Sequence, residues 1–191
     1  MAADSRTRMV QSAAMLLRER GLSGTSFRDV IEHSGAPRGS IYHHFPEGKR
    51  QLVREAVEMS GGWVGDAIAS LEETGDPVET LRAFLGVWAE ILRASDFRAG
   101  CPVVAVSVEA NDDEPEVTEA AAQAFRRWTR ELADGLHGAG MEEERARRLA
   151  TLTVAAIEGA VVLCRAERST APLDDVGAEL EASLRTALVA A

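Results

Sequence analysis

Hydrogen-bond donors are concentrated in residues 37–49, PRGSIYHHFPEGK. This segment holds one guanidinium, two hydroxyls, two imidazoles and one ammonium group. A guanidinium can bind O6 and N7 of guanine through two hydrogen bonds, while the other groups suit phosphate oxygens. We interpret Arg38 as a base-reading residue and Gly39 as allowing close approach to a groove. Phosphate contacts are expected from Ser40, Tyr42, His43 and Lys49. The alternative is a solvated basic helix end.

The pair His43 and His44 is a weak candidate for a metal site. Adjacent helical residues diverge by about 100°, and no Cys or carboxylate stands at ligand spacing. The chain also lacks a Ser/His/Asp order, a glycine-rich phosphate loop and an HExxH motif. We therefore predict no catalytic residue, no metal and no cofactor.

Short helices must position these donors. After a first helix, Ser26 and Asp29 form a capping box that opens a second helix. Pro37 suits the first position of a third helix over residues 37–45, in which Ile41 and Phe45 share the inner face. Two short helices joined by a glycine-containing turn, with a preceding helix as a brace, are typical of a helix-turn-helix.

Charge is distributed unevenly along the chain, whose formal net charge is −10. Residues 1–54 hold 9 Lys and Arg against 5 Asp and Glu, whereas the remaining residues hold 12 against 26. The basic end is the one that carries the donors, which favours contact with an anionic polymer there.

Composition indicates a packed helical protein without a membrane span. Hydrophobic residues make up 46% of the chain, and no uninterrupted apolar run approaches the length that a bilayer requires. The first ten residues lack the apolar stretch of a signal peptide, and Cys101 and Cys164 are too few for a disulfide framework. We expect a cytoplasmic protein with reduced cysteines and no membrane partner.

The segment TSFRDVIEHSGAPRGSIYHHFPEGKRQL resembles the N-terminal domain of the TetR family of bacterial transcriptional repressors. The resemblance covers about residues 6–55 and rests on the turn, the Tyr-x-His-Phe motif and the following Lys-x-x-Leu. It implies a homodimer that binds a double-stranded DNA operator. Carried over by position, it implies phosphate contacts from Thr25 or Ser26, Tyr42, His43 and Lys49. It implies base contacts from Arg28, Arg38, Gly39 and Ser40.

The later segment FRAGCPVVAVSVEA and the variant HFPEGKRQL are similar to the LmrA/YxaF-like subgroup, whose members respond to drugs or flavonoids. β-branched residues in the former favour a strand by propensity alone. We expect a helix, because a lone strand has no pairing partner and the resemblance implies a helix there.

The predicted fold is all-α with about nine helices: a helix-turn-helix domain over residues 1–48 and a helical domain for ligand binding and dimerisation over residues 49–191.

Aromatic side chains recur on the helices predicted for the acidic part of the chain. Together they suggest a pocket for a small hydrophobic or aromatic ligand. For any single one of them, ordinary core packing is the alternative. The candidate pocket residues are Trp63, Phe84, Trp88, Phe97, Cys101, Phe125 and Trp128.

The helix expected over residues 142–167 is apolar on two sides, so both sides should be buried. With the last helix it could form a four-helix bundle between two subunits, whereas burial beneath the chain's own helices is the alternative. The candidate interface residues are Leu152, Ala155, Gly159, Val162, Leu180 and Leu184.

Gly61 and Gly62 interrupt the long helix expected after Lys49. Paired glycines weaken a helix and allow a kink. They could form a hinge: when a ligand binds, the part of the helix that carries Trp63 into the pocket would move and separate the two copies of the helix over residues 37–45. Alternatively, they could permit close packing of a neighbouring helix.

The sequence therefore predicts a DNA-binding repressor that a hydrophobic ligand releases from a palindromic operator. A constitutive DNA-binding protein without an effector is the alternative within this class. An enzyme acting on a small molecule is the alternative from another class, and the absence of catalytic motifs disfavours it.

Overall fold

The computed structural model describes residues 4–37, 39–72, 76–110 and 113–189. Within these ranges the chain forms nine α-helices and no strand, which confirms the all-α prediction. The helices are α1 (Ser5–Arg20), α2 (Phe27–Ser34), α3 (Ser40–His44), α4 (Lys49–Glu72), α5 (Pro77–Ala94), α6 (Pro102–Glu109), α7 (Pro115–Gly138), α8 (Glu143–Glu167) and α9 (Ala171–Val189).

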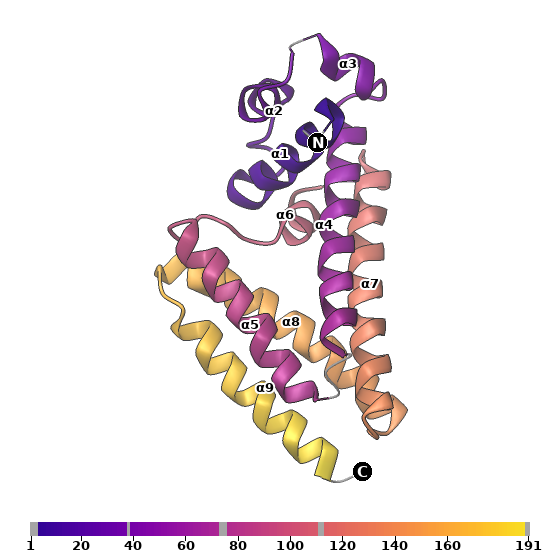
Figure 1. Cartoon of the computed structure of the whole chain (residues 1–191), viewed down its shortest axis with the longest axis vertical. Coiled ribbons are helices and arrows are strands. Elements are labelled where there is room, and N and C mark those ends of the chain that lie inside the picture. Colours follow the sequence, from indigo (N-terminus) through magenta and orange to yellow (C-terminus); the bar gives the residue numbers. More distant parts are fainter. Residues whose placement is uncertain (1–3, 38, 73–75, 111–112, 190–191) are drawn as a thin grey trace. The chain divides into compact units, whose positions relative to one another are not determined.

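The chain divides into two compact units (Figure 1). Unit 1 comprises residues 1–62 and 101–124, and unit 2 comprises residues 63–100 and 125–191. This division differs from the boundary at residue 48 proposed from the sequence. The physical reason is that α4 begins at Lys49 and runs on without a break, so its first half packs with the N-terminal helices.

Unit 1 contains the first helix and the two short helices expected from the sequence. The predicted capping box is present: the Asp29 N–H donates to Ser26 Oγ at 3.2 Å, and the Ser26 N–H donates to Asp29 Oδ2 at 3.0 Å. Gly35 ends α2 with a φ of 64°, a left-handed conformation that glycine adopts without strain. α1 packs against α2, α3 and α6, so it is the brace of this unit.

The third helix is shorter than predicted. It spans Ser40–His44 instead of residues 37–45, because the Ser40 N–H donates to Pro37 O at 3.0 Å and closes a turn before the helix begins. The segment CPVVAVSVEA is helical, as expected, since Pro102 to Glu109 form α6. Its β-branched side chains Val103 and Val106 are fully buried, so packing decides its conformation over propensity.

In unit 2, α9 packs against both α5 and α8 (Figure 1). Asp76 caps α5 by accepting the Val78 N–H at 2.8 Å, and Pro77 lies in the first turn of the helix. Two hydrogen bonds from Arg82 to Glu181, of 3.0 and 2.6 Å, join the exposed edges of α5 and α9.

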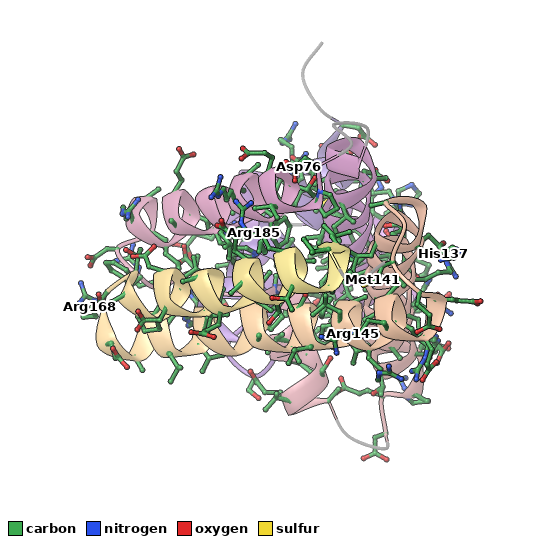
Figure 2. The ribbon with its side chains drawn as sticks, turned by 90° about the horizontal axis from the view of Figure 1, so that it is seen from below. Asp76, His137, Met141, Arg145, Arg168 and Arg185 are labelled. Atoms are coloured by element: carbon green, nitrogen blue, oxygen red, sulfur yellow. The ribbon has the colours of Figure 1, made fainter. Side chains whose placement is uncertain are left out.

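The turn between α7 and α8 is closed by His137, whose Nδ1 lies 2.9 Å from Met141 O (Figure 2). The Met141 side chain is 1% exposed, so this corner of unit 2 is anchored in the core. α8, which follows, is long and apolar enough to cross a membrane by length and composition. A helix packed in the core of a protein meets the same criteria, and the inner side of α8 is such a core face.

Candidate functional site

The outer face of α3 carries polar groups, and its inner face carries buried apolar side chains. Ile41 and Phe45 are 0% exposed, as predicted, whereas Tyr42 is 70% exposed. His43 and Gly39 are also exposed, and a Cβ at Gly39 would meet nothing within 4 Å. The Tyr42 ring stands edge-on to the Phe27 ring, with 5.6 Å between centroids, so α2 fixes its direction. The result is a polar, open helix face of the kind that enters a DNA groove.

The structure describes three of the four base-reading candidates, namely Arg28, Gly39 and Ser40. Arg38 lies outside the described residues. Arg28 is exposed on α2, two residues after its N-cap. The Ser40 hydroxyl donates to Pro37 O at 2.7 Å, so its proton is used by the turn that precedes α3.

The hydroxyl groups of Thr25 and Ser26 are engaged by the protein. Thr25 is 2% exposed and donates to Gly21 O at 2.8 Å, while the Ser26 hydroxyl donates to Asp29 Oδ2. A phosphate contact at this corner would therefore rely on backbone N–H groups of the first turn of α2. The bond from Ser26 is the largest cause of the lowered pKa of Asp29, which keeps the capping carboxylate ionised.

The loop between α1 and α2 is held by two charged side chains. Lys49 Nζ donates to Leu22 O at 2.8 Å, and the Ser23 N–H donates to Glu109 Oε2 at 2.8 Å. Gly21 has a φ of 75°, and a Cβ there would collide with the Glu109 carboxylate. The last residue of α6 therefore positions the backbone from which α2 starts.

Partial desolvation of the Glu109 carboxylate opposes its ionisation, but hydrogen bonds from Ser23 and the Leu22 backbone and the charge of Lys49 outweigh this effect. The net result is a lowered pKa for Glu109. Because the charged form is favoured, Glu109 acts as a permanent acceptor for the loop at neutral pH.

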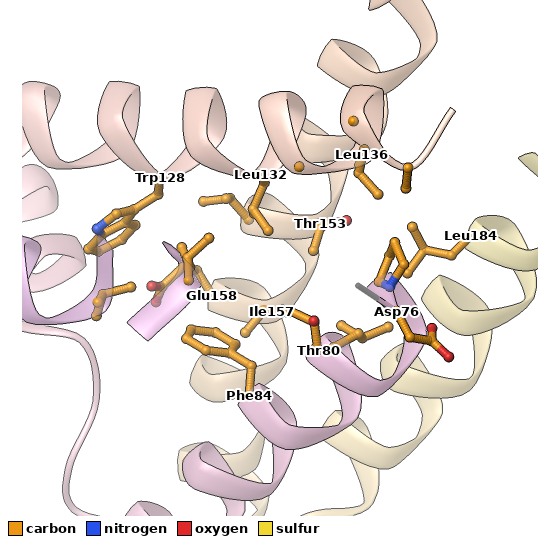
Figure 3. Close-up of a pocket in the computed structure, with 18 residues that line it drawn as sticks. Asp76, Thr80, Phe84, Trp128, Leu132, Leu136, Thr153, Ile157, Glu158 and Leu184 are labelled. Carbon is orange, nitrogen blue, oxygen red and sulfur yellow. The ribbon is translucent and has the colours of Figure 1, made fainter. Parts of the chain in front are cut away.

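Unit 2 contains a cavity of about 310 Å³ between parts of five helices (Figure 3). Its walls are mainly aliphatic and aromatic, with Phe84 from α5 and Trp128 from α7. Four lining side chains are polar: Asp76, Thr80, Thr153 and Glu158. This volume is at the lower end of the range for pockets that bind small molecules.

Two of the seven pocket candidates, Phe84 and Trp128, line this cavity. Trp63 is 56% exposed and does not contribute to the lining, and Trp88 is packed in the core at 6% exposure. Phe125 stands edge-on to Trp128, with 5.2 Å between ring centroids, but is outside the lining. Phe97 is half-buried outside the lining, and Cys101 is buried in unit 1.

The candidate interface residues fall into two groups. Leu152 and Val162 are each 53% exposed, and the small residues Ala155 and Gly159 between them are exposed too. Leu180 and Leu184 are each 3% exposed, since α9 uses its single apolar stripe inside unit 2. The structure thus separates an open apolar face on α8 from a closed one on α9.

Sequence reasoning missed Glu109 and Glu158. No local pattern marks Glu109, because its partner Ser23 lies 86 residues away in the chain. Glu158 had a signal: it is the one charged residue in the sixteen from Leu149 to Cys164. An ionisable residue in an apolar helix that lines a cavity is a candidate for function.

Among the described residues there is no group of three His, Cys, Asp or Glu side chains suited to holding a metal.

Residues 10–56 match the family model "Bacterial regulatory proteins, tetR family". Residues 77–179 match the model "Transcriptional regulator LmrA/YxaF-like, C-terminal domain". The two matches cover the helix-turn-helix and most of unit 2 respectively.

Full-length relatives agree with these models. An HTH-type transcriptional regulator of Mycobacterium tuberculosis is 44% identical, over 92% of this chain and 91% of that protein. The HTH-type transcriptional regulator LmrA of Bacillus subtilis is 33% identical, over 89% and 91%. A TetR-family regulator of Agrobacterium tumefaciens, a solved structure, has a TM-score of 0.81 at 26% identity over 94% and 96% of the two chains. The chain therefore belongs to the TetR family of helix-turn-helix transcriptional regulators, with an LmrA/YxaF-like C-terminal domain, and not to a class of enzymes.

Proposed function

We propose that this regulator is a cytoplasmic homodimeric repressor that binds a palindromic operator and is released by a small hydrophobic ligand. The observation that carries the proposal is the pairing of an open polar face on α3 with an apolar cavity in unit 2. The first suits a major groove, and the second suits a flat apolar molecule.

The proposed dimer uses the open face of α8. Leu152, Val162 and Leu163 are each about half exposed, and such apolar groups on one helix face favour association with a second copy. A surface hollow lined by Leu152, Ala156 and residues of α9 continues this face. Two-fold symmetry would present two copies of α3 to two half-sites about one helical turn or slightly more apart.

The test is selection of bound fragments from genomic DNA, followed by footprinting with the full chain and with Leu152→Glu. We expect a protected inverted repeat for the wild type. Leu152→Glu should sediment as a monomer and lose affinity for the repeat, because it places a charge in an apolar interface. Val87→Glu, an exposed valine on α5, is the matched control and should remain a dimer. Full affinity for a single half-site would contradict the dimeric mode.

A constitutive DNA-binding protein is the alternative. A screen for compounds that release the selected fragment separates the two possibilities, since a constitutive protein would stay bound in the presence of every compound that enters the cavity.

A further inference from the structure

We propose that the cavity of unit 2 binds an apolar or aromatic molecule that carries a positive charge, with Glu158 as its counter-charge. This inference rests on the proposed ligand release and names the chemical class of the ligand.

The charged groups of the cavity lining have one sign. Among the described residues that line it, the ionisable side chains are Asp76 and Glu158, and there is no Lys, Arg or His. Within a cavity of low polarity, water screens a carboxylate weakly, so it repels an anionic ligand and attracts a cationic one. The lining thus discriminates by charge as well as by shape.

The two carboxylates lie at different positions along their helices. Asp76 is the N-cap of α5, where its Oδ1 accepts the Val78 N–H and the helix dipole favours a negative charge. Glu158 lies in the interior of α8, more than two turns from either end, where the dipole of the helix gives little support. Of the two, Glu158 is the carboxylate whose negative charge is not favoured by a helix end.

Glu158 also has suitable neighbours. Its carboxylate points into the space that Trp128 and Phe84 line (Figure 3). Trp128 is 2% exposed, so its ring is fixed. Aromatic faces attract ammonium groups, and an ionised carboxylate beside them strengthens that attraction. Aliphatic residues complete the lining and suit the apolar body of such a molecule: Val64, Ile68, Leu132, Leu136, Ile157 and Leu184.

The test uses three naphthalene probes of nearly the same shape. One carries an ethyl-trimethylammonium group, one its neutral tert-butyl isostere, and one a propionate group. Binding to the full-length protein is measured by calorimetry. We expect the ammonium probe to bind about tenfold more tightly than the tert-butyl probe, equivalent to about 1.4 kcal/mol, with the propionate probe weakest.

Glu158→Gln removes the charge and keeps the shape of the side chain. We expect it to abolish the preference for the ammonium probe and to leave the affinity for the tert-butyl probe unchanged, which also reports an intact cavity. Glu167→Gln, at an exposed position on the same helix, is the control and should behave as the wild type. If Glu158→Gln does not fold, the preference of the wild type for the ammonium probe over the tert-butyl probe decides.

Equal binding of the ammonium and tert-butyl probes by the wild type would overturn the proposal, as would a preference that survives in Glu158→Gln. A tert-butyl or propionate probe that binds better and releases the operator fragment would overturn the cationic class while supporting ligand release. Binding of none of the three also overturns the cationic class, and the compound screen on the operator fragment then tests ligand release independently.

Discussion

The α3 face and the cavity of unit 2 differ in how their residues come together. The α3 face is built from neighbours in sequence: Gly39, Tyr42 and His43 supply exposed groups, and the buried side chains of Ile41 and Phe45 hold the helix in place. The cavity is built from side chains of five helices, spread from Val64 to Leu184. A function carried by one short helix is encoded locally, whereas a cavity depends on how distant helices pack.

The largest expected change in stability comes from a substitution on the buried side of α3, and a substitution on its exposed side should change DNA binding instead. Phe45→Ala should lower the free energy of unfolding by about 3–5 kcal/mol, because it empties a fully buried site. Tyr42→Ala, at a side chain that is 70% exposed, should cost under about 1 kcal/mol in stability while weakening DNA binding. Urea titrations and fluorescence anisotropy measure the two quantities. A Tyr42→Ala protein with unchanged affinity for DNA would remove this residue from the interface.

The second prediction concerns Gly61, where unit 1 ends within α4. A Cβ at Gly61 would lie 2.6 Å from the Cβ of Ala124, so Gly61→Ala should destabilise the protein by about 1–3 kcal/mol. Gly86→Ala is the matched control: it has open space and should gain up to about 1 kcal/mol from helix propensity.

A double-mutant cycle tells close packing apart from a hinge. Ala124→Gly removes the opposing methyl, so the pair Gly61→Ala/Ala124→Gly should recover most of the loss seen in urea titrations. If the restored pair also responds to a releasing compound as the wild type does, packing alone explains Gly61. A restored pair with altered release would support the hinge.

The third prediction separates specificity from affinity on the DNA side. Arg38→Ala should lower the binding free energy by about 1–3 kcal/mol through the loss of one base contact, and it should relax the base preference at that position. Lys49→Ala should weaken binding to all DNA sequences and lower the slope of log K against log salt concentration by about one. Lys49 also donates to Leu22 O, so stability is measured alongside affinity. Equal losses on specific and random DNA for Arg38→Ala would contradict its base-reading role.

Much of the fold could be predicted because its signals are local. The capping box of Ser26 and Asp29 and the glycine-containing turn at Gly35 each follow from a few neighbouring residues. The start of α3 was misplaced because Pro37 suits a turn as well as a first helical residue. In such cases the pattern allows two local structures, and tertiary contacts select one.

The cavity and the interface were harder to predict, because an apolar stripe does not specify its partner. The stripe of α9 packs inside unit 2, which buries Leu180 and Leu184, although the sequence suggested a second subunit as the partner. Trp63 and Trp128 are both aromatic and helical, but only Trp128 lines the cavity. Helical periodicity gives the face on which a residue lies and leaves open which helix covers that face.

The smallest expected effect concerns Glu109, through which α6 holds the loop before α2. Glu109→Gln replaces a charged acceptor of the Ser23 N–H with a neutral one, so it should lower the free energy of unfolding by about 1 kcal/mol at pH 7. It should also weaken DNA binding slightly, since the start of α2 is held less firmly. Glu32→Gln, at an exposed position on α2, is the control for stability.

The loss caused by Glu109→Gln should depend on pH in a defined direction. The pKa of Glu109 is lowered in the folded protein, so its charge contributes stability above the pKa of an unfolded glutamate, about 4.3. That contribution is lost as the pH falls through the folded pKa, where the wild-type side chain becomes protonated. Urea titrations of both proteins should therefore differ by a constant amount above about pH 5 and converge in more acidic solution. A difference that stayed constant down to acidic pH would show that Glu109 acts through its shape and not its charge.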